Sequence, residues 1–167
     1  SQSNITGPNP TMTSRGSDRL LELKVGQTER LVRTITAEDV ATFARLSGDH
    51  NALHVDDEFA ARTEFGQRVV HGFLNASLLS TLVGMKLPGR GALYVSQDIA
   101  FTKPVFIGDT VEARATVEAI DPDTRLVTLK TEILRSDDDC VMRGRATVKV
   151  LRLAEPDTGA HVAAPAA

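Results

Sequence analysis

A segment from Gly72 to Leu87 is apolar around most of its helical circumference, and this limits what the chain can fold into. Its apolar residues include Phe73, Leu74, Ala76, Leu78, Leu79, Leu82, Val83 and Met85. Pro88 and Gly89 follow and end the helix. A helix of this length spans about 24 Å, which is too short to cross a membrane. We therefore expect a helix buried on nearly all sides by a sheet of the same protein.

The alternation of apolar and polar residues in several segments predicts that sheet. In the segment 110–120 the odd positions are apolar and the even positions up to 118 are polar, which is typical of a half-buried antiparallel strand. We expect strands over 92–103, 110–120, 126–135 and 141–153, with turns at 121–124 and 137–139. Twist lets strands of this length curl around a helix. The predicted fold is α+β, a curved antiparallel sheet wrapped around one central apolar helix.

The chain is long enough for one sizeable core. It has 167 residues, of which 41% are hydrophobic, so one domain is expected. Residues 1–19 begin with a polar stretch that lacks the basic start and apolar run of a secretory signal, and we interpret them as a flexible arm. Residues 154–167 consist mainly of Ala, Pro, Gly and isolated charges, which is typical of a flexible tail. The folded domain is therefore predicted over 20–153.

The charge balance gives no reason to expect nucleic acid or a membrane as a partner. Nineteen Lys and Arg oppose 22 Asp and Glu, so the formal net charge is -3 and any anionic ligand must be held locally. The single cysteine, Cys140, cannot form an intrachain disulfide or a Cys-based zinc site. A reducing cytoplasm fits this composition.

The segment 47–56 holds the residues best suited to chemistry. It follows an amphipathic helix that we predict between a Thr36 cap and Gly48. Asp49 could be an ordinary turn residue or a catalytic carboxylate. His54 could pack against its apolar neighbours or act as an acid or a base. The local pattern leaves both alternatives open.

A metal site is a weaker interpretation of the same segment. Asp49, His50, His54 and Asp56 are possible ligands, but two histidines at i and i+4 share one metal only on a regular helix. Gly48 and Asn51 disfavour such a helix here, so we expect no metal. Asp56 and the two acidic residues after it are expected to cap and begin a short helix.

The sequence supports neither covalent catalysis nor the binding of a nucleotide cofactor. Cys140 lies in a predicted strand with no base nearby in sequence, and no Gly-x-Ser-x-Gly motif occurs. Neither glycine-rich phosphate-binding pattern is present, so no nucleotide cofactor is expected.

The start of the apolar helix, at His71 and Gly72, could bind a carbonyl oxygen. A helix start offers unpaired N–H groups and a positive dipole potential, and Gly72 has no side chain to block the approach of a ligand. The alternative is that Gly72 only permits a tight turn, with His71 packed beside it.

These segments together resemble the MaoC-like branch of the hot-dog superfamily, and most closely the (R)-specific 2-enoyl-CoA hydratases. Residues 49–54, Asp-His-Asn-Ala-Leu-His, resemble the Asp-x-Asn-Pro-Leu-His loop of that family, and His71-Gly72 resembles its helix start. Segments 87–91 and 101–109 also match, and the resemblance covers about 20–153. Ala52 stands where the family usually has proline, which loosens the backbone of the loop.

The resemblance implies reversible hydration of trans-2-enoyl-CoA to (R)-3-hydroxyacyl-CoA. Asp49 and His54 would activate water, and the Gly72 N–H would polarise the thioester carbonyl. The reaction needs water at Cβ, a proton at Cα and stabilisation of charge on the carbonyl oxygen, which these groups can supply. Which of the two side chains takes the proton is left open. No metal and no cofactor is implied, since CoA is part of the substrate.

The resemblance also implies a homodimer whose acyl tunnel is bordered by both protomers. Ser80, Val83 and Val148 would lie near the acyl chain, although a hydroxyl in mid-helix such as that of Ser80 can also bond back to a backbone carbonyl. The open edges of a sheet of about five strands need covering, and pairing two copies is one solution.

Three other functions are kept as alternatives: a 3-hydroxyacyl dehydratase acting on an acyl carrier protein, a hot-dog acyl-CoA thioesterase and a non-catalytic acyl-CoA-binding module. Use of a carrier protein favours a basic docking patch near the tunnel mouth. A thioesterase would direct water at the carbonyl carbon. A binding module has no need of Asp49 and His54 together.

Overall fold

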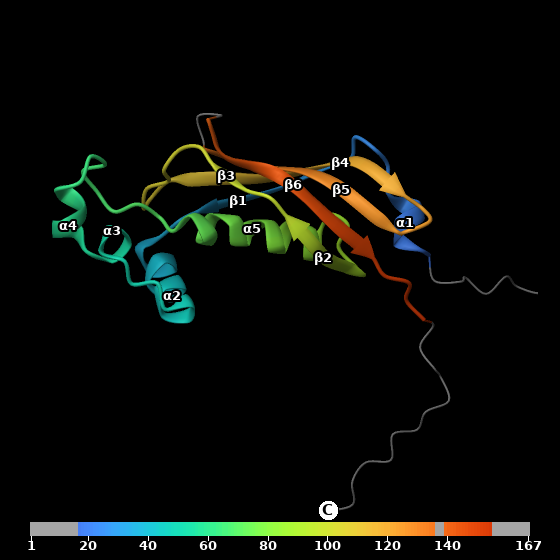
Figure 1. Cartoon of the computed structure of the whole chain (residues 1–167), viewed down its shortest axis with the longest axis horizontal. Coiled ribbons are helices and arrows are strands. Elements are labelled where there is room, and N and C mark those ends of the chain that lie inside the picture. The colour runs from blue at the N-terminus through green and yellow to red at the C-terminus, as the bar shows by residue number, and fades with distance from the viewer. Residues whose placement is uncertain (1–16, 136–138, 155–167) are drawn as a thin grey trace, which may run out of the picture.

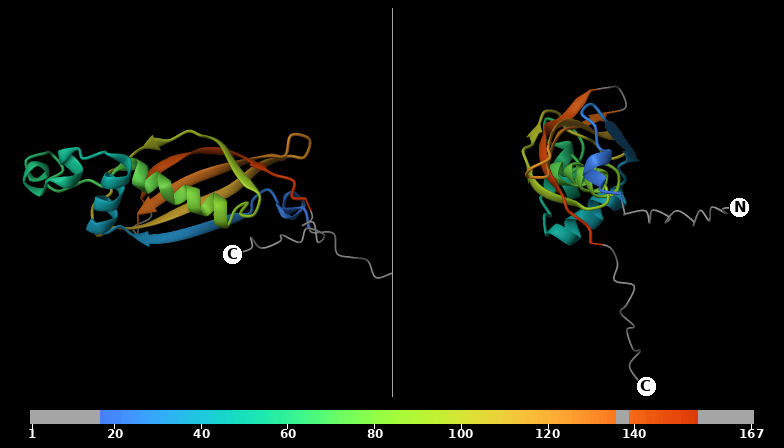
Figure 2. Two further views of the ribbon diagram at one scale, coloured as in Figure 1. Left: turned by 90° about the horizontal axis from the view of Figure 1, so that it is seen from below. Right: turned by 90° about the vertical axis from the view of Figure 1, so that its right-hand side faces the viewer.

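The structure, a computed structural model, describes residues 17–135 and 139–154. Its sheet is antiparallel, with the order β1-β4-β5-β6-β2, and β3 pairs with β6. The strands are β1 (Thr28–Thr34), β2 (Ala92–Gln97), β3 (Ala100–Phe101), β4 (Thr110–Asp121), β5 (Leu126–Arg135) and β6 (Cys140–Val150). Figures 1 and 2 show this sheet curving around the long helix α5 (Gly72–Met85). The predicted α+β architecture is confirmed.

The strands at the centre of the sheet follow the alternating pattern. β4 and β5 lie where they were predicted, and β6 ends at Val150, three residues before the expected position. The expected strand over 92–103 is divided into β2 and β3. The pairing of β2 with β6 shifts register between Tyr94 and Ser96, and the Asp98 N–H then donates to the Arg145 carbonyl between the two short strands. The predicted turn at 137–139 falls mostly outside the described residues.

β1 is a correction, because no strand was predicted over 28–34. Its sequence, Thr-Glu-Arg-Leu-Val-Arg-Thr, contains only two apolar residues. The strand lies at the end of the sheet order, paired with β4, and most of its side chains are exposed. An edge strand needs little apolar alternation, so the pattern that identifies central strands is missing here.

Three short helices between β1 and α5 carry the segment rich in acids and bases. α2 (Ala37–Ser47) begins with the predicted Thr36 cap and ends at Gly48, whose φ of 80° is left-handed. α4 (Asp57–Ala61) begins with the predicted Asp56 cap. α3 (Ala52–Val55) lies between them and was not predicted. It begins where the Asn51 side chain accepts a hydrogen bond from the Leu53 N–H.

One side of α5 packs into the core and the other does not. Its buried apolar residues, which join the main core cluster, are Leu74, Leu78, Leu79, Leu82 and Val83. On the other side Phe73 is 67% exposed and Met85 is 77% exposed. The prediction that this helix is buried on nearly all sides is therefore wrong for the single chain, because the sheet curves only part of the way around it.

The N-terminal boundary also differs from the prediction. Asp18, which was assigned to the flexible arm, caps α1 (Arg19–Glu22). Its carboxylate accepts two hydrogen bonds of 2.7 and 2.9 Å from the buried Arg125 guanidinium at the β4–β5 turn. Arg125 Nε also donates to the Val150 carbonyl at the end of β6. These bonds tie α1 to the sheet, so the folded part begins before residue 20.

Residues 1–16 and 155–167, which make up most of the predicted arm and tail, lie outside the described residues. Within the described ranges, no helix is long and apolar enough to cross a membrane.

The link between Asp18 and Arg125 predicts a stability that depends on pH. At neutral pH, Asp18→Asn should lower the thermal unfolding midpoint by a few degrees, because the buried Arg125 loses its partner charge. The Arg125 hydrogen bonds lower the pKa of Asp18 from 3.8 to about 2. Since the folded-state pKa is the lower one, this stabilisation is complete above pH 3.8 and is lost as the pH falls through about 2.

Thermal scans at several pH values should therefore show the difference between the two proteins shrinking over that range. Asp123→Asn is the matched control, because Asp123 is an exposed residue in the same β4–β5 turn. Equal midpoints for Asp18→Asn and the unmodified protein at neutral pH would contradict the prediction.

Candidate active site

A cavity of about 610 Å³ lies where the first turn of α5 meets the α2–α3 connection. Apolar side chains, among them Phe43, Phe101 and Met142, form much of its wall. Its lining also includes polar residues and a glycine, namely Asp49, His54, His71, Gly72 and Asn75. The structure thus brings together Asp49, His54 and Gly72, which the sequence predicted for the site. The catalytic roles of Asp49 and His54 and the substrate-binding role of Gly72 stay predictions.

His54 is held in one orientation by the backbone next to it. Its Nδ1 lies 2.6 Å from the Val69 carbonyl oxygen, and since a carbonyl can only accept, Nδ1 carries the hydrogen. The Val69 N–H in turn donates to the Leu53 carbonyl at 3.2 Å. These two bonds fix α3 against the segment that leads into α5. In the neutral ring, His54 Nε2 is therefore an acceptor.

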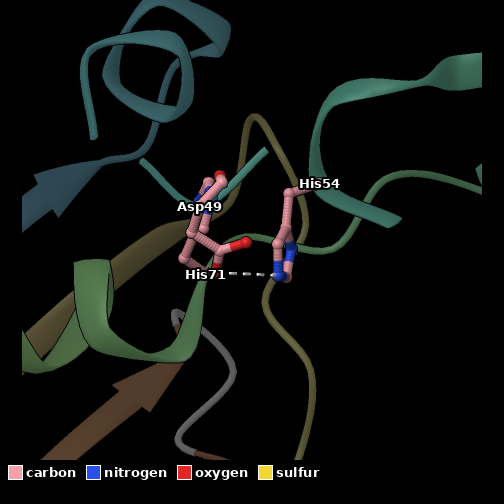
Figure 3. Close-up of side chains that lie close together, drawn as sticks. All are labelled: Asp49, His54 and His71. Atoms are coloured by element: carbon pink, nitrogen blue, oxygen red, sulfur yellow. Dashed lines mark hydrogen bonds and ion pairs between the residues drawn. The ribbon is translucent and has the colours of Figure 1, made fainter. Parts of the chain in front are cut away.

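Asp49 faces that acceptor from the start of the α2–α3 connection (Figure 3). Its Oδ1 accepts a hydrogen bond from the Asn51 N–H at 3.1 Å, and its Oδ2 lies 4.0 Å from His54 Nε2. Two acceptors at this separation do not bond directly. One water oxygen about 2.8 Å from each can donate one hydrogen to each, so the pair is spaced to hold a water molecule.

His71 supports both members of the pair. Its Nε2 donates to the Asp49 carbonyl oxygen at 3.0 Å, and its ring stacks on His54 with centroids 4.0 Å apart. Phe43 packs on His71 at 4.9 Å, and His71 is only 2% exposed. The sequence left open whether His71 only packs beside Gly72, and it did not predict this contact with Asp49 and His54. The adjacent His-Gly motif was the available signal.

Gly72 is the first residue of α5, as predicted. The N–H groups of Leu74 and Asn75 both donate to the His71 carbonyl. The Gly72 N–H lies before these bonds and is one of the N–H groups that the helix itself does not pair. The backbone at Gly72 is not left-handed, so it does not itself require glycine. A Cβ there would lie 2.8 Å from Phe101 Cε1, so space inside the cavity, rather than a strained turn, favours glycine.

The three residues predicted near an acyl chain do not line this cavity. Ser80 is exposed on the outer side of α5. Val83 on the inner side of the same helix and Val148 on β6 are buried in the main core. Their contact with an acyl chain stays a prediction.

The residues weighed as metal ligands divide into two groups. His50 and Asp56 point to other partners, because His50 Nδ1 bonds the Gly48 carbonyl at 3.2 Å and Asp56 caps α4. Asp49 and His54 instead come together with His71, and one possible ligand atom from each lies within 4.8 Å of the others. The expectation that no metal binds at these residues stays a prediction.

Known proteins are similar to this chain in sequence and in fold. The MaoC like domain family matches residues 22–136. An (R)-specific enoyl-CoA hydratase of Aeromonas caviae is 45% identical over 77% of this chain and 96% of its own length. A 3-hydroxybutyryl-CoA dehydratase of Methylorubrum extorquens is 43% identical over 81% of this chain and 86% of its own length.

A solved structure of a related protein has a similar fold. The (R)-hydratase from A. caviae involved in PHA biosynthesis superposes with a TM-score of 0.75 at 45% identity, covering 77% of this chain and 98% of that one. This likeness supports the hot-dog architecture implied by the Asp49–His54 and His71-Gly72 motifs. Because the family matches more than half of the sequence and the relatives match nearly all of their own length, the chain belongs to the MaoC-like family.

Proposed function

We propose that the protein catalyses the reversible hydration of trans-2-enoyl-CoA to (R)-3-hydroxyacyl-CoA. The observation that carries this proposal is the 4.0 Å separation of His54 Nε2 and Asp49 Oδ2 beside the start of α5. The names of the two relatives support it, because dehydration of a 3-hydroxyacyl-CoA and hydration of an enoyl-CoA are the two directions of one reaction.

In the proposed mechanism, Asp49 and His54 hold the attacking water. The water oxygen adds to Cβ of the alkene while one of its protons passes to His54 Nε2, which the Val69 bond keeps free to accept it. The Asp49 carboxylate orients the water and stabilises the imidazolium that forms. His54 then returns the proton to Cα, so the product gains one hydroxyl and one hydrogen. Dehydration uses the same groups in reverse.

The Gly72 N–H is proposed to stabilise the thioester carbonyl. Negative charge grows on this oxygen as water adds to Cβ, and an N–H at a helix start is already oriented towards it. Proton transfer and charge stabilisation are then both supplied by the chain, so we propose that no metal and no cofactor takes part.

The acyl chain and the assembly complete the proposal. We expect Ser80, Val83 and Val148 to lie along the acyl chain once a second protomer closes the tunnel. A homodimer is supported by two apolar surfaces of the single chain: the edge strand β2 exposes Leu93 and Val95, and α5 exposes apolar side chains on its outer side. The single cysteine, Cys140, supports a reducing compartment such as the cytoplasm.

Crotonyl-CoA tests the function together with the two side chains. The unmodified protein should remove the enoyl absorbance and leave the thioester intact. Asp49→Asn and His54→Ala should each reduce turnover on the order of 10²-fold or more, because each removes one group that holds the water. If both act on one water, the double variant should be scarcely slower than the slower single variant.

His50→Ala is the matched control, since His50 is exposed on the same connection outside the cavity lining. Near-normal turnover in both single variants would reject the assignment of Asp49 and His54. Release of free CoA would indicate a thioesterase, and binding without turnover a binding module. A strong preference for the same acyl group on a carrier protein would indicate the carrier-protein dehydratase.

Gly72 substitutions test the carbonyl site. Gly72→Val should impair turnover strongly and Gly72→Ala less, because the added side chain meets Phe101 and narrows the approach to the Gly72 N–H. Unfolding midpoints measured alongside the rates separate lost folding from lost catalysis. If a folded Gly72→Val variant hydrates crotonyl-CoA at the unmodified rate, the carbonyl is polarised elsewhere.

Chelation tests the absence of a metal. Treatment with EDTA should leave hydration unchanged, because Asp49 and His54 are proposed to hold water directly. Elemental analysis of the purified protein provides the independent measurement. Activity that EDTA removes and a divalent ion restores would mean that Asp49, His54 and His71 act as ligands.

A further inference from the structure

Asn75 is a buried polar side chain that the mechanism above does not use. It is 5% exposed and is the one polar residue among the buried residues of α5, a helix that the structure describes completely. Its Oδ1 is buried and has no hydrogen-bond partner in the described part of the chain. Buried amides are normally satisfied, because leaving one unpaired costs free energy. An amide held by no bond at Oδ1 can rotate, so that its N–H₂ end faces a bound ligand that accepts a hydrogen bond.

The position of Asn75 indicates which ligand atom it would meet. It lies three residues after Gly72 on α5 and lines the same cavity as Gly72, Asp49 and His54. Residues at i and i+3 share a helix face, and side chains on a helix lean back towards its N-terminus. We therefore expect the Asn75 amide to lie over the first turn of α5, near the Gly72 N–H.

The chemistry of the amide matches a carbonyl oxygen. A carboxamide has an N–H₂ end and a carbonyl end, and rotation about its last bond exchanges them. A ligand carbonyl can only accept hydrogen bonds, so it selects the N–H₂ end. The positive potential at the start of α5 favours an electron-rich oxygen at the same place.

We propose that the Asn75 side chain donates a second hydrogen bond to the thioester carbonyl oxygen, alongside the Gly72 N–H. Two donors fixed by one helix turn stabilise the charge that develops on this oxygen without reorganising during the reaction. The inference rests on the proposed function in one respect, namely that the substrate is a thioester bound at the start of α5.

Two substitutions of similar size separate catalysis from folding. Asn75→Leu removes the donor, and Asn75→Asp also places a negative charge beside the developing oxyanion. Turnover of crotonyl-CoA should fall about 10²-fold in Asn75→Leu, as for other lost oxyanion donors, and further in Asn75→Asp. The unfolding midpoint of Asn75→Leu should not fall, because an unpaired buried amide is replaced by an apolar group.

Ser77→Ala is the matched control, because Ser77 lies on α5 outside this cavity lining and its hydroxyl donates to the Leu74 carbonyl. It should leave turnover unchanged. Full activity in a folded Asn75→Leu variant would overturn the proposal. A lowered midpoint in Asn75→Leu that accounts for its lost activity would also overturn it, since Asn75 would then serve packing alone.

A spectroscopic measurement reads the hydrogen bond directly. Butyryl-CoA labelled with ¹³C at the carbonyl has no double bond to hydrate, so its infrared carbonyl band can be recorded on the protein. Binding to the unmodified protein should lower the frequency of this band, and binding to Asn75→Leu should lower it less. An equal shift in both proteins would overturn the proposal.

The infrared result is independent of turnover, so the two proposals can fail separately. A shift that depends on Asn75 in a protein that does not hydrate crotonyl-CoA would retain the donor and reject the hydratase function. Normal hydration with no effect of Asn75 on either measurement would retain the hydratase function and reject the donor.

Discussion

Burial of one side of α5 against the curved sheet is the interaction on which the rest of the structure depends. Leucine and valine side chains on that side join the main core cluster with residues of β4, β5 and β6. Their removal from water fixes the axis of the helix. With the axis fixed, the first turn of α5 opens into the cavity, and both Gly72 and Asn75 take their positions from the packing of the buried side of the same helix.

The other wall of the cavity is positioned by polar contacts. Caps at Thr36, Asn51 and Asp56 begin α2, α3 and α4, and the Val69 backbone connects α3 to the segment entering α5. His71 adds a bond to the Asp49 carbonyl. Hydrogen bonds of this kind specify angles as well as distances, which suits a pair that must hold one water molecule.

Local signals predicted some of these features and long-range contacts determined the others. The alternation in β4 and the cap at Thr36 are properties of neighbouring residues, so the sequence predicted them. β1 was missed because an edge strand needs little apolar alternation. The stacking of His71 on His54 and the burial of Asn75 arise only when α5 packs beside α3, and nothing in the spacing of the residues records that packing.

Two buried polar atoms without a hydrogen-bond partner among the described residues lie at the cavity where a substrate would bind. Asn75 Oδ1 and His71 Nδ1 are both buried and unpaired in the described part of the chain, and both residues line the cavity. An unpaired buried amide oxygen costs free energy, so Asn75 should lower the stability of the free protein relative to an apolar residue of similar size. A protein that retains such groups at one end of a helix whose other buried residues are apolar has hydrogen-bonding groups available for a ligand. Helix α5 therefore stabilises the core along most of its length. Its unpaired buried amide lies instead in the first turn, where the proposed chemistry takes place.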